Sequence, residues 1–324
     1  MKILVIGLLL ATTALADVEV SPTASIGGYE AKFIDVNGIR TRYYEAGSGE
    51  PMLLLHGAPW GGVASANTWV ENFETLSRHF HVYAPDRIGA GLTDNPLRDE
   101  DYNEVAMHRH MRDFIKTLGL APVHIVAHSL GGLSLYMVAE EPELAKTMVL
   151  VASTHASPSV GTSRRLSVLK NCSTDEDGTD WYAEWKCRYE ALSYDPSHVT
   201  EEFALSVKYM NETPKAEFAR QKLRSGVGGE LHANFYEYRR TMHKRIMDEG
   251  MLQMPIMIYW GRQDPMQPLE RAMALYDVLA AKNPRVQLTM TNKAGHFSYR
   301  ERPEVFNQVV INWIDSWRQL GVID

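Results

Sequence analysis

Residues 123–133, Val-His-Ile-Val-Ala-His-Ser-Leu-Gly-Gly-Leu, constrain the fold of this 324-residue chain more than any other stretch. An apolar, partly β-branched run leads into Ser129, small residues surround the serine, and a helix-forming segment follows. This order predicts a strand, a sharp turn with Ser129 at its apex, and a helix. Ala127 and Gly131 are small enough for such a turn, although glycine usually stands where Ala127 does. A serine that merely caps the helix is the alternative.

Short apolar runs alternate with segments of helical spacing along most of the chain. Residues 31–45 alternate around Asn37-Gly38, a strong turn signal, and predict an antiparallel hairpin. A continuous apolar run at residues 52–55 is typical of a strand buried on both faces. Further strands are expected at residues 80–84, 148–151, 256–260 and 286–290. Segments with helical spacing include residues 103–118 and a long closing helix that begins at Pro303. We therefore predict an α/β fold, with a mostly parallel sheet covered by helices on both faces.

The strand pattern disappears between residues 154 and 250. Polar and charged residues become more frequent there, and aromatic residues recur at helical spacings. We interpret this segment as a helical cap inserted into the α/β core. The predicted organisation is a signal peptide at 1–16, a first core part at 17–153, the cap at 154–250 and a second core part at 251–324.

The first residues of the chain have the features of an export signal. Lys2 precedes an apolar run that closes on Ala-Leu-Ala at residue 16, before the acidic Asp17. The run is too short to span a bilayer comfortably. We predict a secretory signal peptide that is cleaved near Ala16, and hence a secreted or periplasmic mature protein without a membrane span. An uncleaved anchor is the alternative.

The cysteine usage and the net charge bear on compartment and partners. The chain has two cysteines, Cys172 and Cys187, and an exported protein is expected to join them in a disulfide. Closing such a loop contributes roughly 3 kcal/mol in the chain-entropy model; two unpaired thiols are the alternative. The net charge of −7 disfavours nucleic acid as a partner. Nothing in the sequence specifies the oligomeric state.

Two further residues follow predicted strands, as Ser129 does. Asp264 lies in Gly-Arg-Gln-Asp-Pro after the strand at 256–260, and His296 lies in Ala-Gly-His-Phe after the strand at 286–290. Active groups of parallel sheets gather beyond the carboxyl ends of the strands. We predict a triad in which Ser129 is the nucleophile, His296 the base and Asp264 the group that orients His296. A turn-forming Asp264 and a structural His296 are the alternatives.

The loop at residues 56–62, His-Gly-Ala-Pro-Trp-Gly-Gly, is too rich in glycine to be ordinary packing. We expect the backbone N–H groups of Ala58 and Leu130 to form an oxyanion hole. His128, beside the nucleophile, is expected to line the pocket. The closely spaced histidine pairs lack the further ligands of a metal site, so neither a metal nor an organic cofactor is implied.

The order Ser, Asp, His after a sharp strand-to-helix turn is the order found in α/β hydrolases. Nearly the whole mature chain resembles α/β hydrolases with a helical cap, and it is most similar to meta-cleavage product hydrolases. Those enzymes hydrolyse a carbon-carbon bond in vinylogous dienoic acids, which arise from ring opening of catechols. The similarity lies in His56-Gly57 with Asn67 eleven residues after the histidine, in residues 261–264, in Pro268-Leu269, and in Gly295-His296 followed by Phe306-Asn307.

This resemblance implies a small-molecule substrate and a role for Asn67 in holding its carboxylate. The chain departs from the family where substrates bind: it has Pro59-Trp60 in the loop, His128 where asparagine is frequent, and Phe297 where the family has tryptophan. Lys208 is the nearest equivalent of the cap arginine that pairs with the substrate carboxylate. The substrate-binding residues expected on this basis are Gly57, Asn67, His128, Lys208 and Phe297.

These observations predict an exported serine hydrolase that acts on carbon-carbon bonds of vinylogous dienoic acids. A carboxylesterase that acts on small esters is the main alternative, and Asn67 then only orders its loop. A peptidase similar to proline iminopeptidases and a ligand receptor without catalysis are further alternatives. Enzymes that need an aspartate nucleophile, such as haloalkane dehalogenases and epoxide hydrolases, are disfavoured by Ser129.

Overall fold

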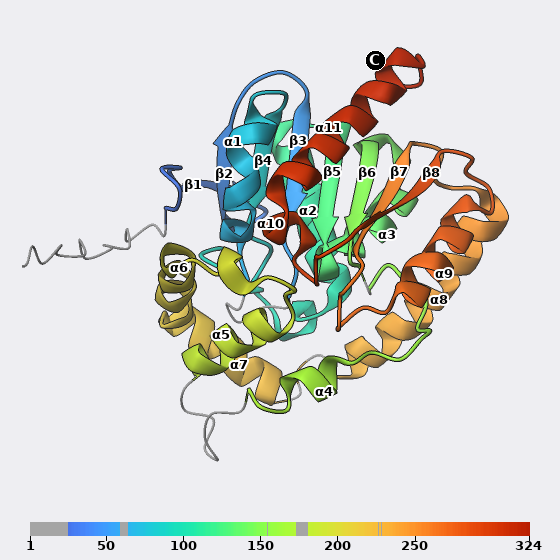
Figure 1. Ribbon diagram of the computed structural model, residues 1–324. Coiled ribbons are helices and arrows are strands. Elements are labelled where there is room, and N and C mark those ends of the chain that lie inside the picture. Colours follow the sequence, from blue (N-terminus) through green and yellow to red (C-terminus); the bar gives the residue numbers. More distant parts are fainter. Residues whose placement is uncertain (1–24, 59–63, 154, 173–180, 226, 228) are drawn as a thin grey trace, which may run out of the picture.

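The computed structural model describes residues 25–58, 64–153, 155–172, 181–225, 227 and 229–324 (Figure 1). The predicted signal peptide at 1–16 and Pro59-Trp60 lie outside these residues. Within the described ranges, no helix has both the length and the apolar character that crossing a membrane requires.

The predicted mostly parallel sheet is confirmed. Eight strands follow the order β1-β2-β4-β3-β5-β6-β7-β8. Strand β2 pairs antiparallel with both of its neighbours, β1 and β4, and all other pairs are parallel. Their bounds are β1 Lys32–Val36, β2 Ile39–Ala46, β3 Pro51–Leu55, β4 His81–Pro85, β5 Val123–His128, β6 Ala145–Val151, β7 Ile256–Gly261 and β8 Val286–Thr291. Asn37 and Gly38 both have positive φ, as the tight turn between β1 and β2 requires.

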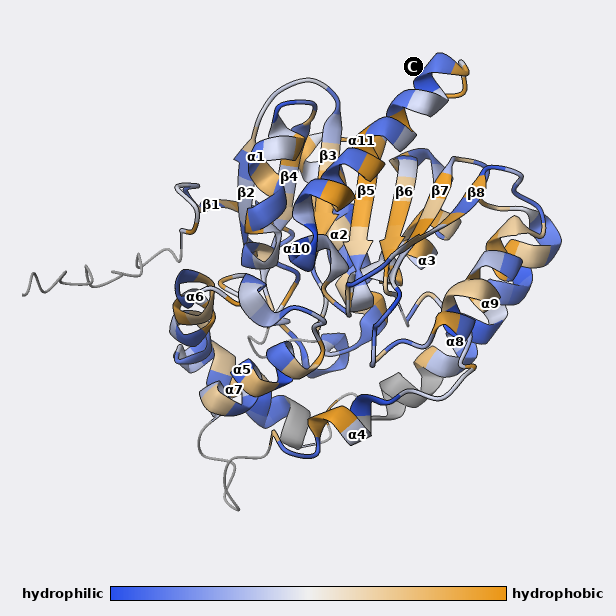
Figure 2. Ribbon diagram, in the orientation of Figure 1, coloured by the Kyte–Doolittle hydropathy of each residue, from blue (hydrophilic) through white to orange (hydrophobic). Residues whose placement is uncertain are grey.

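Helices cover both faces of the sheet, as predicted. Side chains of the central strand β5 alternate between two hydrophobic clusters: Ile125 packs with the first and Val126 with the second. The first cluster includes residues of α2 (Glu104–Leu118), α3 (Ser134–Glu140) and α9 (Leu269–Ala280). The second includes residues of α1 (Val70–Ser77) and α11 (Pro303–Gln319). The inner strands β5, β6 and β7 are accordingly mainly apolar, whereas helices such as α11 carry both polar and apolar residues (Figure 2).

The described part of residues 155–250 is helical. It contains α4 (Arg165–Leu169), α5 (Trp181–Ala191), α6 (Glu201–Asn211), α7 (Pro214–Arg224) and α8 (Gly229–Glu249). Helices α4, α5 and α7 lie beyond the carboxyl ends of the parallel strands, and α8 returns along the side of the molecule to α9 (Figure 1). On this placement we propose that α4 to α8 form the cap, with the boundaries expected from the sequence.

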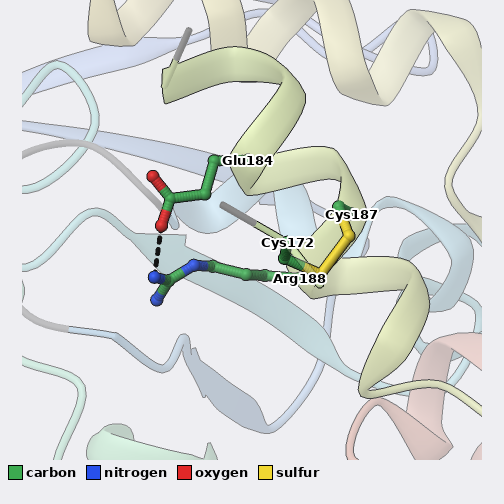
Figure 3. The surroundings of a disulfide bond; sticks show 4 residues. All are labelled: Cys172, Glu184, Cys187 and Arg188. Carbon is green, nitrogen blue, oxygen red and sulfur yellow. Dashed lines mark ion pairs between the residues drawn. A yellow bond between two sulfur atoms is a disulfide. The ribbon is translucent and has the colours of Figure 1, made fainter. Parts of the chain in front are cut away.

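The cap contains the disulfide predicted from the sequence. Cys172, just after α4, is bonded to Cys187 in α5, and their Cα atoms lie 5.4 Å apart (Figure 3). The bond therefore ties α5 to the end of α4, both of which contribute side chains to the cavity described below.

Several histidines outside the predicted triad are buried, and their burial predicts a protein that loses stability in acid. Burial lowers the pKa to about 3 for His56, His108 and His198, and to about 4 for His110, His124 and His243. The unfolded chain has histidine pKa values near 6.5, so unfolding takes up protons below that pH. We expect the urea midpoint to fall steadily as the pH decreases from about 6.5 to 4.

His108 offers a direct check, because neither of its ring nitrogens has a hydrogen-bond partner. The substitution His108→Leu should reduce the slope of stability against pH, whereas His79→Gln, at an exposed histidine, should leave it unchanged. A urea midpoint that stays constant between pH 7 and pH 4.5 would contradict this account.

Candidate active site

The turn predicted around Ser129 is present. The serine directly follows β5, begins the short 3₁₀ helix Ser129–Leu133 and precedes α3. Its φ is +51°, in the left-handed region that non-glycine residues rarely adopt. The conformation places the side chain at the carboxyl end of the central strand, where Ser129 lines the cavity while the residue as a whole is 7% exposed.

Close packing explains the small residues around this turn. A Cβ atom at Gly131 would lie 2.7 Å from the carbonyl oxygen of Leu55 in the neighbouring strand β3. A Cβ atom at Gly57 would lie 2.9 Å from the Cβ atom of Ser129 itself. Both distances are too short for carbon contacts, so a larger residue at either position must displace the serine or the loop that faces it.

Side chains from three strand ends meet at this point. Nε2 of His296 lies 3.3 Å from Oγ of Ser129, and Nδ1 of His296 lies 2.9 Å from Oδ2 of Asp264. Oδ1 of Asp264 accepts backbone hydrogen bonds from Met266 and Gln267, at 2.8 and 2.9 Å. The carboxylate can only accept from His296, so the proton belongs on Nδ1, and Nε2 is left as an acceptor for the serine hydroxyl. This is the arrangement that activates a serine nucleophile.

A cavity of about 360 Å³ opens beside Ser129 and His296. Its core side includes Gly57, Ala58, Thr68 and His128. Its cap side is rich in aromatic and aliphatic side chains from α4, α5 and the residues that follow α5, which are Leu169, Trp181, Trp185, Tyr189 and Leu192. The cavity can therefore accept an extended, largely apolar molecule next to the serine.

Three of the five expected substrate-binding residues, Gly57, His128 and Phe297, line this cavity. Of the expected oxyanion donors, Ala58 also lines it and has a φ of +58°. The Leu130 side chain is buried in the core, and its backbone nitrogen directly follows Ser129 at the start of the 3₁₀ helix.

The structure does not bring Asn67 to the cavity, which corrects the expectation that it holds a substrate carboxylate. The residue is fully buried. Its Nδ2 donates to Ser206 of α6 at 2.9 Å, and its Oδ1 accepts from Arg42 at 3.1 Å and from Tyr44 at 2.8 Å. Arg42 is in turn paired with the buried Asp86 at 2.7 Å. The amide of Asn67 therefore belongs to a hydrogen-bonded network that joins β2, the 3₁₀ helix Ala66–Trp69 before α1, and the cap.

Lys208 is likewise absent from the cavity wall. It lies on α6 with its side chain 45% exposed, and its Nζ atom is 3.9 Å from Glu212 and 5.7 Å from the ring centroid of Tyr182. The expectation that Lys208 pairs with a substrate carboxylate is therefore also corrected, because α6 presents this side chain to solvent.

The cationic side chains at the cavity are instead arginines that sequence reasoning missed. Arg165, Arg188 and Arg220 line it, together with Glu184. On α5, residues 181, 184, 185, 188 and 189 fall at the spacings that share one helix face, and residue 192 just beyond the helix continues the pattern. That periodicity was the available signal, but only the tertiary structure shows that this face is turned toward Ser129.

His128 supports the loop that carries His296. Its Nε2 donates to the carbonyl oxygen of His296 at 3.0 Å, and the two ring centroids lie 4.8 Å apart. Burial lowers the pKa of His128 well below its usual value, so this ring is neutral and donates only through Nε2. The residue thus both lines the cavity and fixes the backbone of the predicted base.

Glu301 of α10 (Ser298–Glu301) is a second residue that the sequence did not reveal. Its buried carboxylate accepts backbone N–H bonds from Gly295 and Phe297, on either side of His296, at 3.0 and 3.2 Å. It also accepts from Tyr194 and Asp195, just beyond α5, at 2.7 and 3.1 Å. Burial raises the pKa of Glu301, and the four N–H donors oppose that rise. One carboxylate therefore joins the His296 loop to the cap.

We expect Glu301→Gln to disturb this junction, because a glutamine amide presents its NH₂ group to N–H donors. The free energy of unfolding should fall by about 1–3 kcal/mol. Displacement of His296 should lower kcat about 10- to 100-fold with little change in KM. The exposed Glu304 provides the matched control Glu304→Gln. Steady-state kinetics and urea unfolding check both effects, and equal behaviour of the two variants would contradict the role of Glu301.

Among the residues that the structure describes, no group of three or more His, Cys, Asp or Glu is placed to hold a metal ion.

Comparison with known proteins agrees with this fold. A family model for the alpha/beta hydrolase fold matches residues 50–303. The chain belongs to this family and is a hydrolase, so the predicted resemblance to α/β hydrolases is confirmed. Its relatives and structural neighbours include meta-cleavage product hydrolases and other serine hydrolases, and also epoxide hydrolases.

Three similar proteins illustrate this. The 2-hydroxy-6-oxo-6-(2'-aminophenyl)hexa-2,4-dienoic acid hydrolase of Metapseudomonas resinovorans is 37% identical over 131 residues, which span 40% of this chain and only 44% of that relative. The 2-hydroxy-6-oxo-2,4-heptadienoate hydrolase of Pseudomonas putida is 26% identical over 87% of this chain and 95% of that protein. The crystal structure of a serine hydrolase involved in carbazole degradation has a TM-score of 0.68 at 23% identity, covering 89% of this chain and 99% of that one.

Proposed function

We propose that this protein is a serine hydrolase in which Ser129 is the nucleophile, His296 the general base and Asp264 the residue that orients His296. The observation that carries the proposal is the continuous contact from Oδ2 of Asp264 through the His296 ring to Oγ of Ser129. The residue order and the strained turn at Ser129 support the same assignment.

In the proposed reaction, His296 takes the proton of Ser129 as Oγ attacks a carbonyl carbon of the substrate. The backbone N–H groups of Leu130 and Ala58 stabilise the oxyanion that forms. The tetrahedral intermediate then releases its leaving group, which receives the proton from His296. Water, activated by the same histidine, finally hydrolyses the acyl group from Ser129.

We propose that the bond cleaved is the carbon-carbon bond of a vinylogous dienoic acid. The leaving carbanion of such a substrate is stabilised by conjugation, so His296 can complete the reaction by protonating carbon. Relatives that cover most of the chain are named as hydrolases of 2-hydroxy-6-oxo-2,4-heptadienoate and 2-hydroxymuconate semialdehyde. The aromatic wall formed by Trp181, Trp185 and Phe297 suits a planar conjugated chain. In place of Asn67 and Lys208, we assign the substrate carboxylate to Arg188, which lines the cavity.

A carboxylesterase is the second candidate. The observation that favours it is the position of Asn67, whose buried network leaves it no contact with the cavity. Ester hydrolysis needs the triad and the oxyanion donors but no carboxylate anchor.

One panel of substrates separates the two candidates. Ring-cleavage dienoic acids and short p-nitrophenyl esters are assayed on the mature protein, and loss of the dienoate absorbance is followed. We expect dienoic acids to have the higher kcat/KM. The substitution Arg188→Gln should raise their KM about 10- to 100-fold, as loss of a charge-assisted hydrogen bond predicts. If esters are turned over efficiently and dienoic acids not at all, the carbon-carbon assignment is wrong and the esterase assignment holds.

We also propose that the protein is exported. The N-terminal sequence has the pattern of a cleaved signal peptide, and the Cys172–Cys187 disulfide suits an oxidising compartment. Mass spectrometry of the mature protein should show an N-terminus near Asp17 and no free thiol. An intact N-terminus starting at Met1 in the purified protein would contradict cleavage.

A further inference from the structure

Two opposite charges on α5 lie together at the cavity. Glu184 and Arg188 are one helical turn apart and form an ion pair (Figure 3). Both line the cavity beside Ser129. Their side chains are 30% and 44% exposed. Between them in the sequence stands Cys187, whose disulfide to Cys172 fixes this part of α5 to the end of α4. The disulfide therefore helps to hold α5, and with it the ion pair, at the cavity.

The other cavity arginines differ from Arg188 in their surroundings. Arg220 donates to the side chain and the backbone of Asn211, at 3.2 and 2.9 Å, and pairs with Glu217 at 2.9 Å. Arg165, on α4, is an exposed residue. By contrast, Glu184, the acidic partner of Arg188, itself lines the cavity. A ligand that reaches Arg188 therefore also meets the carboxylate of Glu184.

This arrangement has a consequence for anionic ligands. Glu184 holds the guanidinium of Arg188 in one place, and it also cancels part of the positive charge that a ligand would meet. Solvent-exposed pairs at this helical spacing are only weakly stabilising, so the carboxylate of a ligand can replace that of Glu184. A neutral ligand gains nothing from this exchange.

We propose that Glu184 is a specificity-determining residue: it competes with the carboxylate of the substrate for Arg188 and so sets how strongly the cavity prefers anionic over neutral ligands. The proposal deepens the proposed function and rests on it for the nature of the substrate. It does not depend on whether the bond cleaved is a carbon-carbon or an ester bond.

Ligand binding can be measured without turnover, because Trp181 and Trp185 line the cavity and report on its contents by fluorescence. Benzoate is the anionic probe and benzamide the neutral one. We expect Glu184→Gln, which keeps the size and hydrogen-bonding groups of the side chain, to bind benzoate about 3-fold more tightly. We expect Arg188→Gln to bind benzoate about 10- to 100-fold more weakly. For benzamide, which carries no charge that could pair with Arg188, the change in affinity should be smaller than for benzoate in both variants.

A matched control lies on the same helix. Lys186 and Glu190 are also four residues apart on α5, with their charged atoms 3.9 Å apart, and neither lines the cavity. The substitution Glu190→Gln should leave benzoate binding unchanged. Thermal unfolding of all variants shows whether α5 is intact, because loss of the helix would weaken the binding of both probes together.

Kinetics with a pair of esters extends the test to substrates. A p-nitrophenyl monoester of glutaric acid carries a free carboxylate, whereas p-nitrophenyl valerate is neutral. We expect Glu184→Gln to lower the ratio of KM for the charged ester to KM for the neutral ester about 3-fold.

The possible outcomes separate this proposal from the proposed function. If dienoic acids are not substrates but Glu184→Gln still tightens benzoate binding selectively, the carbon-carbon assignment fails and the role of Glu184 stands. If dienoic acids are substrates but benzoate binding is unchanged or weakened in Glu184→Gln, the role of Glu184 is wrong. Failure of the unmodified protein to bind benzoate more tightly than benzamide also overturns it.

Discussion

Replacing Ser129 with alanine is expected to lower kcat about 10⁶-fold on any substrate of this enzyme. The hydroxyl lost in Ser129→Ala is the only polar atom of the side chain, and it lies 3.3 Å from Nε2 of His296. Without it the proposed acyl-enzyme cannot form, and the proposed oxyanion donors and binding groups are expected to give only residual catalysis. The fold should be unchanged, because alanine occupies less space at the same backbone position.

A serine five residues further along the chain supplies the control. Ser134 is buried in α3, and its hydroxyl has no hydrogen-bond partner. Ser134→Ala should therefore keep full activity and stability. A fluorophosphonate should label the unmodified protein at Ser129, as peptide mass spectrometry would show, and should not label Ser129→Ala. Turnover that survives in Ser129→Ala would remove the proposed mechanism.

The substitution Asp264→Asn is expected to lower kcat about 10⁴-fold while preserving the fold. Oδ1 of Asp264 accepts two backbone N–H bonds, from Met266 and Gln267. An asparagine keeps these bonds only if its oxygen stays there, which turns its NH₂ group toward Nδ1 of His296. That nitrogen must then become an acceptor, so the ring proton moves to Nε2. A protonated Nε2 cannot take the proton of Ser129.

Steady-state kinetics and circular dichroism test this expectation. Asp277→Asn, at an exposed position of α9, is the matched control and should behave like the unmodified protein. The affinity of the Asp264→Asn protein for benzoate should be unchanged, since the defect concerns a proton and not the cavity. If Asp264→Asn retained more than one-tenth of the activity, Asp264 could not be the group that orients His296.

The strand and helix pattern of the core could be predicted from the sequence because it depends on local periodicity. The run that ends at Ser129, the turn at Asn37-Gly38 and the closing helix from Pro303 each carry a local signal that burial on a sheet reinforces. The positions of Asp264 and His296 after predicted strands followed from the same pattern, since the carboxyl ends of parallel strands share one edge.

The contacts of the cap could not be predicted in this way. Asn67 matched a family position in sequence, yet in the structure its amide is used by Arg42, Tyr44 and Ser206. Lys208 and Arg188 both lie on helices of the proposed cap, and nothing in their local sequence tells which helix face is turned toward the cavity. Glu301 gave no signal at all, because its four N–H partners come from two separate segments.

The sequence by itself determined the layered core, the disulfide partners and the three residues that meet at the edge of the sheet. Each of these depends on the order and spacing of residues along the chain. Only the tertiary structure decided which polar and charged side chains reach the cavity and which form hydrogen bonds within buried networks. The physical reason is that a polar side chain satisfies its hydrogen bonds with whatever groups folding brings beside it, and those groups are distant in the sequence.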